Sequence, residues 1–319
     1  MHKHKKPAFT MIEVVFVIVI LGIVASIGSS LIVKTYESYI LQRALHRVSL
    51  STELAAMQLV NRLTFRIDKT TVARRPAAPY DFITVSSISS NGDDIHTALE
   101  WISYDDDSFS ATLTPGWSGY ADVIDPGNSR AAFATPGSNL GSASTIIGNL
   151  SDATVSLTGG GGDRPAIFFN ADEYRDGNTT SSYGAGCMGL DYATNDTSCI
   201  LAVSGTVNAG AADILNFTDA AHTGRTKTIY EHYKLAWSAY AVVPVLIPNT
   251  TLYELRLYYN YQPWQGEEYT GAPYATLLRN VSVFKFSESG GTVRLKLCAQ
   301  QNIAGTKNVT ICKEKAIIR

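Results

Sequence analysis

The sequence predicts an α+β fold, in which a long N-terminal α-helix, part transmembrane and part amphipathic, packs on an antiparallel β-sheet head with a loop-rich insertion. Two observations favour the helix: residues 14–33 carry no charge, and apolar residues continue at helical spacing beyond them. A third observation concerns the rest of the chain. From residue 80 onward, short apolar runs alternate with Gly, Pro, Asn and Asp. This pattern is typical of short strands joined by turns.

The uncharged run at residues 14–33 is long enough to cross a membrane. As a helix, its 20 residues span about 30 Å at roughly 1.5 Å per residue, which matches the hydrocarbon core of a bilayer. Lys3, Lys5 and Lys6 all precede the run, so the positive-inside rule predicts a cytoplasmic N-terminus and export of the chain beyond Val33. An ordinary secretory signal is the alternative, but the run exceeds the usual apolar core of about 7 to 15 residues.

Glu13 stands at the start of this apolar run. A carboxylate at the centre of a membrane helix costs on the order of 2.5 to 3.5 kcal/mol, so an acid here needs a partner or a task. One interpretation places Glu13 at the headgroup level, where the positive end of the helix dipole favours an anion. The other places it against a positive group on another subunit. The charge alone does not separate the two.

The residues around Glu13 form a recognisable signal. The basic and small residues Lys5-Lys6-Pro7-Ala8 are followed by Phe9-Thr10-Met11-Ile12-Glu13 and a run of Val, Ile and Leu. This order resembles the class III signal of type IV prepilins and type II secretion pseudopilins. The resemblance implies that a prepilin peptidase cleaves between Ala8 and Phe9 and methylates the new amine of Phe9, and that Glu13 is the assembly carboxylate that meets this amine on a neighbouring subunit. The family usually has Gly before the cut, whereas this chain has Ala8.

The resemblance and the helical pattern together divide the chain. Residues 1–8 are expected to form a cytoplasmic leader, residues 9–33 the transmembrane and assembly half of the helix, and residues 34–70 its amphipathic half. Residues 76–319 are expected to form a β-rich periplasmic head with a loop-rich region at about 115–228. The amphipathic half is indicated by side chains at steps of three and four, namely Leu41, Leu45, Val48, Thr52, Ala55, Leu59 and Leu63.

The first part of the head reads as short strands. The helix is expected to end near Asp68, and strands are expected at residues 80–85, 99–104 and 109–113. Three consecutive acids, residues 105–107, raise the possibility of a calcium site. They lack the Gly and the distal Glu of an EF-hand loop, so a solvated turn is the favoured interpretation.

Regular structure returns in the last third of the chain. Residues 233–243 and 253–261 alternate apolar and polar side chains and predict an antiparallel pair. Residues 281–286 and 293–297 predict a second hairpin, and residues 309–312 can return beside its last strand. This closing layout also resembles that of large minor pilins and minor pseudopilins.

Four cysteines lie in the part of the chain that is expected to be exported. An even number in an oxidising compartment predicts two disulfides, although three pairings are possible. Pairing neighbours joins Cys187 to Cys199 and Cys298 to Cys312. The second pair is equidistant from Gly305, so a hairpin centred there would place its two cysteines opposite each other. Zinc is the competing idea, but no Cys-x-x-Cys spacing and no nearby His support it.

Two common enzyme motifs are absent from the chain. It lacks Gly-x-Ser-x-Gly and His-Glu-x-x-His, so we expect no catalytic residue, no cofactor and no metal. Removing residues 1–8 with their three lysines changes the formal charge from -2 to -5, which disfavours nucleic-acid binding. The alternative is a single-span membrane-anchored periplasmic enzyme or a carbohydrate- or ligand-binding protein. Its candidate site, for which sheet packing is the competing interpretation, is the aromatic segment with Tyr258, Tyr259, Tyr261, Trp264, Tyr269 and Tyr274.

The resemblance therefore implies a structural function. We expect a minor pilin or pseudopilin subunit of a type IV pilus or type II secretion-like filament, assembled through its N-terminal helix after cleavage. Major pilins are usually shorter than this chain, which favours a minor subunit. The expected partners are the prepilin peptidase, other pilin or pseudopilin subunits and inner-membrane lipid. The expected location is the bacterial inner membrane, with a single span, a cytoplasmic N-terminus and a periplasmic head, and then the assembled filament.

Overall fold

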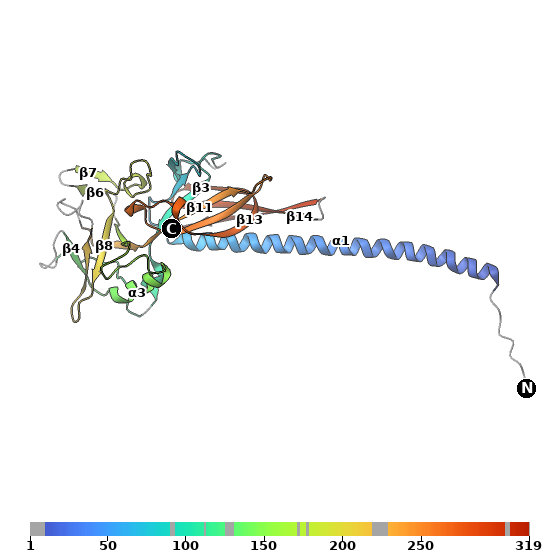
Figure 1. Ribbon diagram of the computed structural model, residues 1–319, viewed down its shortest axis with the longest axis horizontal. Coiled ribbons are helices and arrows are strands. Elements are labelled where there is room, and N and C mark those ends of the chain that lie inside the picture. The colour runs from blue at the N-terminus through green and yellow to red at the C-terminus, as the bar shows by residue number, and fades with distance from the viewer. Residues whose placement is uncertain are drawn as a thin grey trace, which may run out of the picture.

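The computed structural model describes residues 10–89, 93–111, 113–124, 131–170, 173–176, 179–218, 229–303 and 307–318. One long helix, α1 (Met11–Thr64), projects from a head built of β-sheets. The N-terminal half of α1 extends away from the head, and its C-terminal half lies along the larger sheet (Figure 1). The α+β class and the helix-plus-sheet arrangement predicted from the sequence are confirmed.

The helix α1 begins after Thr10, whose extended backbone marks the N-cap, and ends at Thr64. It is therefore a few residues shorter than the helix expected to reach Asp68. The chain leaves the helix because its backbone starts to pair with the sheet: the amide of Ile67 donates to the carbonyl of Ile102 at 2.8 Å. This pairing fixes the end of the helix to the head.

The larger sheet has eight strands, and every pair of neighbours in it is antiparallel. Alternation along β14 directs Val293 and Leu295 toward α1, while Arg294 and Lys296 point away from it. In spatial order the strands are β15 (Lys307–Ile317), β14 (Thr292–Ile303), β13 (Tyr274–Ser289), β12 (Tyr253–Tyr261), β11 (Ser238–Leu246), β3 (Ala98–Ser103), β1 (Val72–Arg74) and β2 (Phe82–Thr84).

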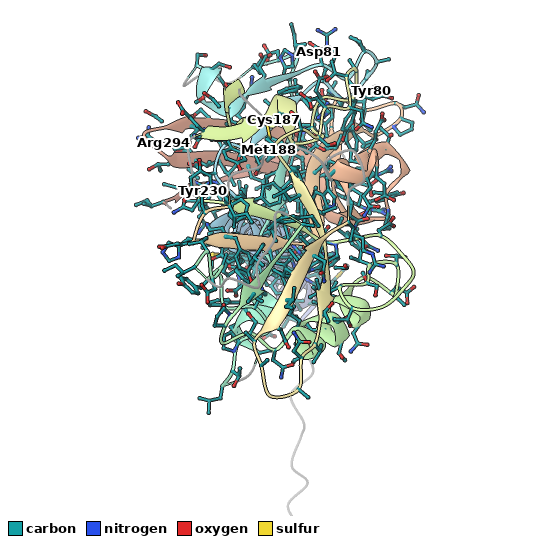
Figure 2. The ribbon with its side chains drawn as sticks, turned by 90° about the vertical axis from the view of Figure 1, so that its left-hand side faces the viewer. Tyr80, Asp81, Cys187, Met188, Tyr230 and Arg294 are labelled. Atoms are coloured by element: carbon teal, nitrogen blue, oxygen red, sulfur yellow. A yellow bond between two sulfur atoms is a disulfide. The ribbon has the colours of Figure 1, made fainter. Side chains whose placement is uncertain are left out.

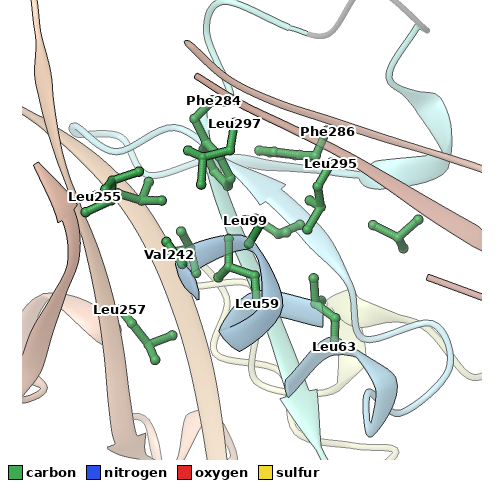
Figure 3. Close-up of a cluster of buried hydrophobic side chains, with 14 of the residues drawn as sticks. Leu59, Leu63, Leu99, Val242, Leu255, Leu257, Phe284, Phe286, Leu295 and Leu297 are labelled. Atoms are coloured by element: carbon green, nitrogen blue, oxygen red, sulfur yellow. The ribbon is translucent and has the colours of Figure 1, made fainter. Parts of the chain in front are cut away.

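The C-terminal half of α1 covers one face of this sheet. Its buried side chains follow the predicted helical spacing from Val48 onward, whereas Leu41, expected on the same face, is exposed. Leu59 and Leu63 are fully enclosed (Figure 3). They pack against strand residues that include Leu99, Phe284 and Leu295. Truncating one such leucine to alanine typically costs about 2 to 5 kcal/mol of stability. The helix and the eight-stranded sheet therefore form one packed unit.

A second sheet lies at the end of the head that is remote from the N-terminus (Figure 1). The helix α3 (Leu140–Leu150) packs into the core of this sheet through Leu140, Ala143 and Ile147. The sequence predicted only a loop-rich region at 115–228, and the structure differs because these strands are short and their connections long. In spatial order the five strands are β10 (Tyr233–Ala236), β5 (Ala166–Phe169), β8 (Leu201–Thr206), β9 (Asp213–Phe217) and β4 (Ala132–Thr135). A separate hairpin is formed by β6 (Glu173–Asp176) and β7 (Thr179–Ser182).

The strand predicted at residues 109–113 is wrong. The structure has a short helix, α2 (Asp106–Ser110), at this point. Asp105 is its N-cap and accepts a hydrogen bond from the amide of Ser108 at 3.1 Å, which favours a helical turn over an extended chain. Four single turns of 3-10 helix complete the described elements: η1 (Val85–Ser87), η2 (Ala185–Cys187), η3 (Pro263–Gln265) and η4 (Tyr269–Gly271).

The strand expected at residues 233–243 is divided between the two sheets. β10 belongs to the five-stranded sheet and β11 to the eight-stranded sheet, with Trp237 between them. Trp237 is buried in the apolar core of the five-stranded sheet. Ala239 is buried in a different apolar cluster, next to the eight-stranded sheet. The expected antiparallel pairing with residues 253–261 is confirmed for the β11 part, from Ala239 opposite Tyr261 onward.

Candidate membrane and assembly site

The N-terminal half of α1 presents an apolar surface that nothing in the described chain covers. Met11 is 88 % exposed, Phe16 63 % and Ile32 71 %, and the most apolar 18-residue window of the helix has no buried residue. By length and composition this helix can cross a membrane. Water-soluble proteins rarely expose a contiguous apolar patch larger than a few hundred Å². We therefore expect lipid or other helices to cover this surface.

Glu13 lies in the first turn of α1 and is exposed. The hydroxyl of Thr10 donates to its Oε2 at 3.5 Å, and among the described residues no cationic side chain forms an ion pair with it. The carboxylate therefore keeps most of its capacity to accept hydrogen bonds. Ala8 and Phe9, at which cleavage and methylation are expected, lie outside the described residues.

The helix continues without a break through its glycines. A Cβ atom placed at Gly22 or at Gly28 would meet no atom within 4 Å. The hydroxyl of Ser30 donates to the carbonyl of Ile27 at 2.8 Å, which satisfies a polar group inside the apolar run. Positions without a side chain allow another helix to approach closely.

Both disulfides expected from the sequence are present. Cys298 and Cys312 face each other across β14 and β15, with their Cα atoms 4.0 Å apart. Cys187 and Cys199 are bonded with Cα atoms 5.4 Å apart. The described residues contain no group of His, Cys, Asp and Glu arranged to hold a metal ion, and the paired thiols leave no ligand for the zinc alternative.

Regularly spaced glycines surround Cys187, which is bonded to Cys199. Residues 184–189 read Gly-Ala-Gly-Cys-Met-Gly, which fits the Gly-x-Gly-x-x-Gly pattern. A dinucleotide site needs that pattern between a strand and a helix. Here it holds the 3-10 turn η2 and Cys187, and Met188 lies beside Cys187 at the surface of the core (Figure 2). The segment is a structural turn.

A buried ion pair within the first sheet also holds this loop, and no sequence pattern indicates it. Nε of Arg74 lies 2.6 Å from Oε2 of Glu100, and neither side chain is exposed. The hydroxyls of Tyr192 and Tyr261 donate to Oε1 of Glu100 at 2.6 and 2.9 Å. Arg74 also donates to the carbonyl of Leu190, so the loop closed by Cys187 and Cys199 is held to the sheet by charge-assisted bonds.

The aromatic segment considered as a ligand site is largely packed into the head. Tyr261, Trp264 and Tyr269 are buried members of one apolar cluster. The ring of Tyr258 lies 5.2 Å from that of Tyr269 and 5.3 Å from that of Tyr274. Edge-to-face and tilted contacts at these distances stabilise a core. This arrangement favours the sheet-packing interpretation.

The three acids at residues 105–107 do not converge on a common point. Asp105 is buried as the N-cap of α2, and its side chain accepts from both the amide and the hydroxyl of Ser108. Asp106 and Asp107 follow in the first turn of that helix. Burial raises the pKa of Asp105 to about 6, although the two bonds from Ser108 act in the opposite direction.

His96 joins two loops of the head. Its Nδ1 lies 3.0 Å from Oδ2 of Asp93, and its Nε2 lies 3.1 Å from Oδ2 of Asp81. Burial alone would lower the pKa of His96, but the hydrogen bonds to the two carboxylates outweigh it and raise that pKa. Asp81 and Tyr80 lie together at the surface of the head (Figure 2). His96 therefore links the two loops through its contacts with Asp81 and Asp93.

Comparison with protein families agrees with the position of the apolar helix. The family model of the prokaryotic N-terminal methylation motif matches residues 3–29. The chain therefore carries a type IV pilin-like class III signal, continuous with a long apolar helix. The motif implies processing by a prepilin peptidase and assembly with other pilin subunits. Comparisons with curated proteins and with solved structures find no match.

Proposed function

We propose that this chain is a structural minor subunit of a type IV pilus or of a type II secretion-like filament. The observation that carries the proposal is the methylation motif at residues 3–29, which runs without interruption into an exposed apolar helix fixed to a β-sheet head. An exposed helix of this kind is stable in lipid before assembly and among other helices after it. The proposed role is structural rather than catalytic.

The proposed topology follows from charge and from the cysteines. Lys3, Lys5 and Lys6 precede the span, which favours a cytoplasmic N-terminus in the inner membrane. The head then lies in the periplasm, where disulfides form and persist. Two bonded cysteine pairs in the head agree with this compartment.

The proposed assembly contact joins Glu13 to the amine of Phe9 on a neighbouring subunit. Cleavage after Ala8 creates that amine, and Glu13 in the first turn of α1 is exposed to receive it. A carboxylate and an ammonium group attract each other strongly where water is scarce. Once subunits leave the bilayer, this contact offsets the cost of keeping an acid in an apolar filament core.

The proposed minor position rests on the shape of the head. The five-stranded sheet and α3 extend the head beyond the part that packs on α1 (Figure 1). A head of this size fits a place with few lateral neighbours, such as the tip or a priming complex, better than a closely packed shaft.

Mass spectrometry of the membrane-extracted protein tests the proposal. We expect an N-terminal peptide that begins at Phe9 and carries one methyl group on its amine. In a strain that lacks the prepilin peptidase, the same protein should begin upstream of Ala8. An unprocessed N-terminus in the presence of active peptidase, or a cut near Gly28, would contradict the proposal and favour an ordinary anchor or secretory signal.

A further inference from the structure

The last strand of the eight-stranded sheet has a free edge. β15 pairs with β14 in an unbroken register from Ile317 opposite Val293 to Lys307 opposite Ile303. The 4.0 Å separation of the Cα atoms of Cys298 and Cys312 marks a non-hydrogen-bonded pair. Cys312 and every second residue on either side of it therefore direct their amides and carbonyls away from β14. These outward residues are Asn308, Thr310, Cys312, Glu314 and Ala316, and all of them are exposed.

The other sheet edges in the described chain are short or covered. β2 has three residues. The edge of β10 is covered by the segment between α2 and β4, because the amide of Tyr233 donates to the carbonyl of Gly119 at 3.0 Å. The edge of β4 is bridged by Asp122, whose amide donates to the carbonyl of Ala134 at 2.9 Å. In β15, by contrast, no described residue bonds to the outward amides, and the strand has no proline and no bulge.

Exposed lysines often prevent an edge strand from pairing with another chain. In β15, two of the lysines instead form ion pairs with α1. Nζ of Lys313 lies 3.4 Å from Oε2 of Glu53, and Lys315 bonds to Oε1 of the same carboxylate. Glu53 belongs to α1, so both ammonium groups are drawn toward the helix side of the sheet. One carboxylate faces two lysines, which leaves a net positive charge along the helix side of the free edge.

We propose that the free edge of β15 is a strand-addition site for an extended, acidic segment of a partner protein. An added strand would bond to the outward amides and carbonyls of Thr310, Cys312 and Glu314. Its acidic side chains, at alternate positions, would face Lys313 and Lys315 on the helix side. The proposal thus combines backbone pairing with complementary charge.

A second copy of this chain is a poorer occupant of the edge. Antiparallel pairing of two β15 edges needs a two-fold axis perpendicular to the strands, which would reverse α1 in one copy because α1 runs alongside the sheet (Figure 1). Two helices anchored in one membrane in the same direction cannot adopt that arrangement, an argument that rests on the proposed function. Such pairing would also bring the lysine-rich strands of both copies together.

The test uses the full chain in lipid nanodiscs and a synthetic nine-residue peptide of threonines alternating with valine and glutamate. Amide hydrogen exchange at Thr310, Cys312 and Glu314 should slow about tenfold or more when the peptide is added. A matched peptide with lysine in place of glutamate should protect these amides much less. Unchanged exchange with millimolar acidic peptide, or equal protection by both peptides, would overturn the proposal.

Three variants separate binding from folding. Thr310→Pro removes an outward amide without removing a bond to β14 and should abolish protection, whereas Thr310→Ala keeps the amide and should retain it. Lys313→Gln leaves the backbone unchanged and should weaken binding of the acidic peptide severalfold. Equal protection in Thr310→Pro and Thr310→Ala would overturn the site.

Concentration-dependent protection of β15 without peptide would assign the edge to self-association and overturn the choice of partner. None of these outcomes depends on cleavage after Ala8. Failure of this proposal is therefore distinguishable from failure of the proposed function.

Discussion

Arg74 and Glu100 form an ion pair in which both side chains are completely buried, with Nε and Oε2 2.6 Å apart. Removing charge from one member of such a pair leaves the other charge buried without a partner, which typically costs about 3 to 5 kcal/mol. The pair joins β1 to β3 and also holds the loop that contains Leu190. Its integrity is therefore expected to matter to the whole head.

We predict that Glu100→Gln lowers the free energy of unfolding of the head by about 3 kcal/mol or more. Urea unfolding of the detergent-solubilised chain measures this change. The control is Glu314→Gln, which removes one member of an exposed pair with Lys296 at 2.8 Å and should change the free energy of unfolding much less, because solvent screens an exposed pair. Similar losses of unfolding free energy in the two variants would show that the buried pair of Arg74 stabilises the head no more than an exposed pair does.

Local patterns in the sequence explain which parts of the fold were predictable. The apolar run and the steps of three and four up to Leu63 predicted α1, and alternation predicted β12, β13 and β14. Symmetry about Gly305 predicted the cross-strand position of Cys298 and Cys312. Each of these signals lies within a short stretch of chain.

The remaining features depend on contacts between distant segments. Arg74 and Glu100 are 26 positions apart, and nothing near either residue indicates the other. β5 has only four residues, and its partners β8 and β10 lie far along the chain. The helix α3 buries Leu140, Ala143 and Ile147, but Ser, Thr, Gly and Asn between them conceal the helical spacing. Short apolar runs of this kind carry too little periodicity to fix a strand or a helix.

The N-cap of α2 should make stability depend on pH. Burial raises the pKa of Asp105 to about 6 from an ordinary value of 3.8, so the folded protein binds more protons than the unfolded chain between about pH 4 and 6. Stability from this group therefore falls as pH rises through that window, by up to roughly 3 kcal/mol.

We predict that Asp105→Asn raises the free energy of unfolding at pH 7.5 by about 1 to 3 kcal/mol and flattens its slope between pH 4 and 7. Asparagine is an equally good N-cap, and its amide can donate to the hydroxyl of Ser108 while its carbonyl accepts from the amide of Ser108. Denaturant unfolding over this pH range is the measurement. Asp107→Asn changes the net charge equally and serves as control; a matching gain in that variant would contradict the role of burial.

The disulfide between Cys298 and Cys312 should stabilise the last hairpin. Replacing both cysteines with alanine should cost about 3 kcal/mol in the chain-entropy model, because it opens a loop with a sequence separation of 14. Hydrogen exchange should speed up in β14 and β15, while the fraction of protein in the membrane stays unchanged. The matched variant lacks Cys187 and Cys199 and should instead loosen the loop around Leu190. Faster exchange at the same place in both variants would contradict separate roles.

The final prediction concerns the carboxylate in the first turn of α1. Glu13→Val should leave membrane insertion intact or ease it, since valine costs less than a carboxylate in the bilayer. Incorporation into filaments should fall, because the variant loses its proposed contact with the Phe9 amine of a neighbour. The same substitution at Glu37, an exposed acid on the same helix beyond the apolar run, is the control and should have little effect on either step.

The comparison is made between membrane and filament fractions of wild type, Glu13→Val and Glu37→Val. An ion pair that is buried among helices is poorly screened, so the defect should persist in high salt, unlike that of a surface pair. A subunit confined to the tip has few neighbours. We therefore expect a partial loss of incorporation into filaments and not a complete one. Equal incorporation of wild type and Glu13→Val would favour the interpretation in which Glu13 only interacts with the helix dipole at the headgroup level. Loss of insertion itself would contradict both interpretations, because neither assigns the carboxylate a role in entering the bilayer.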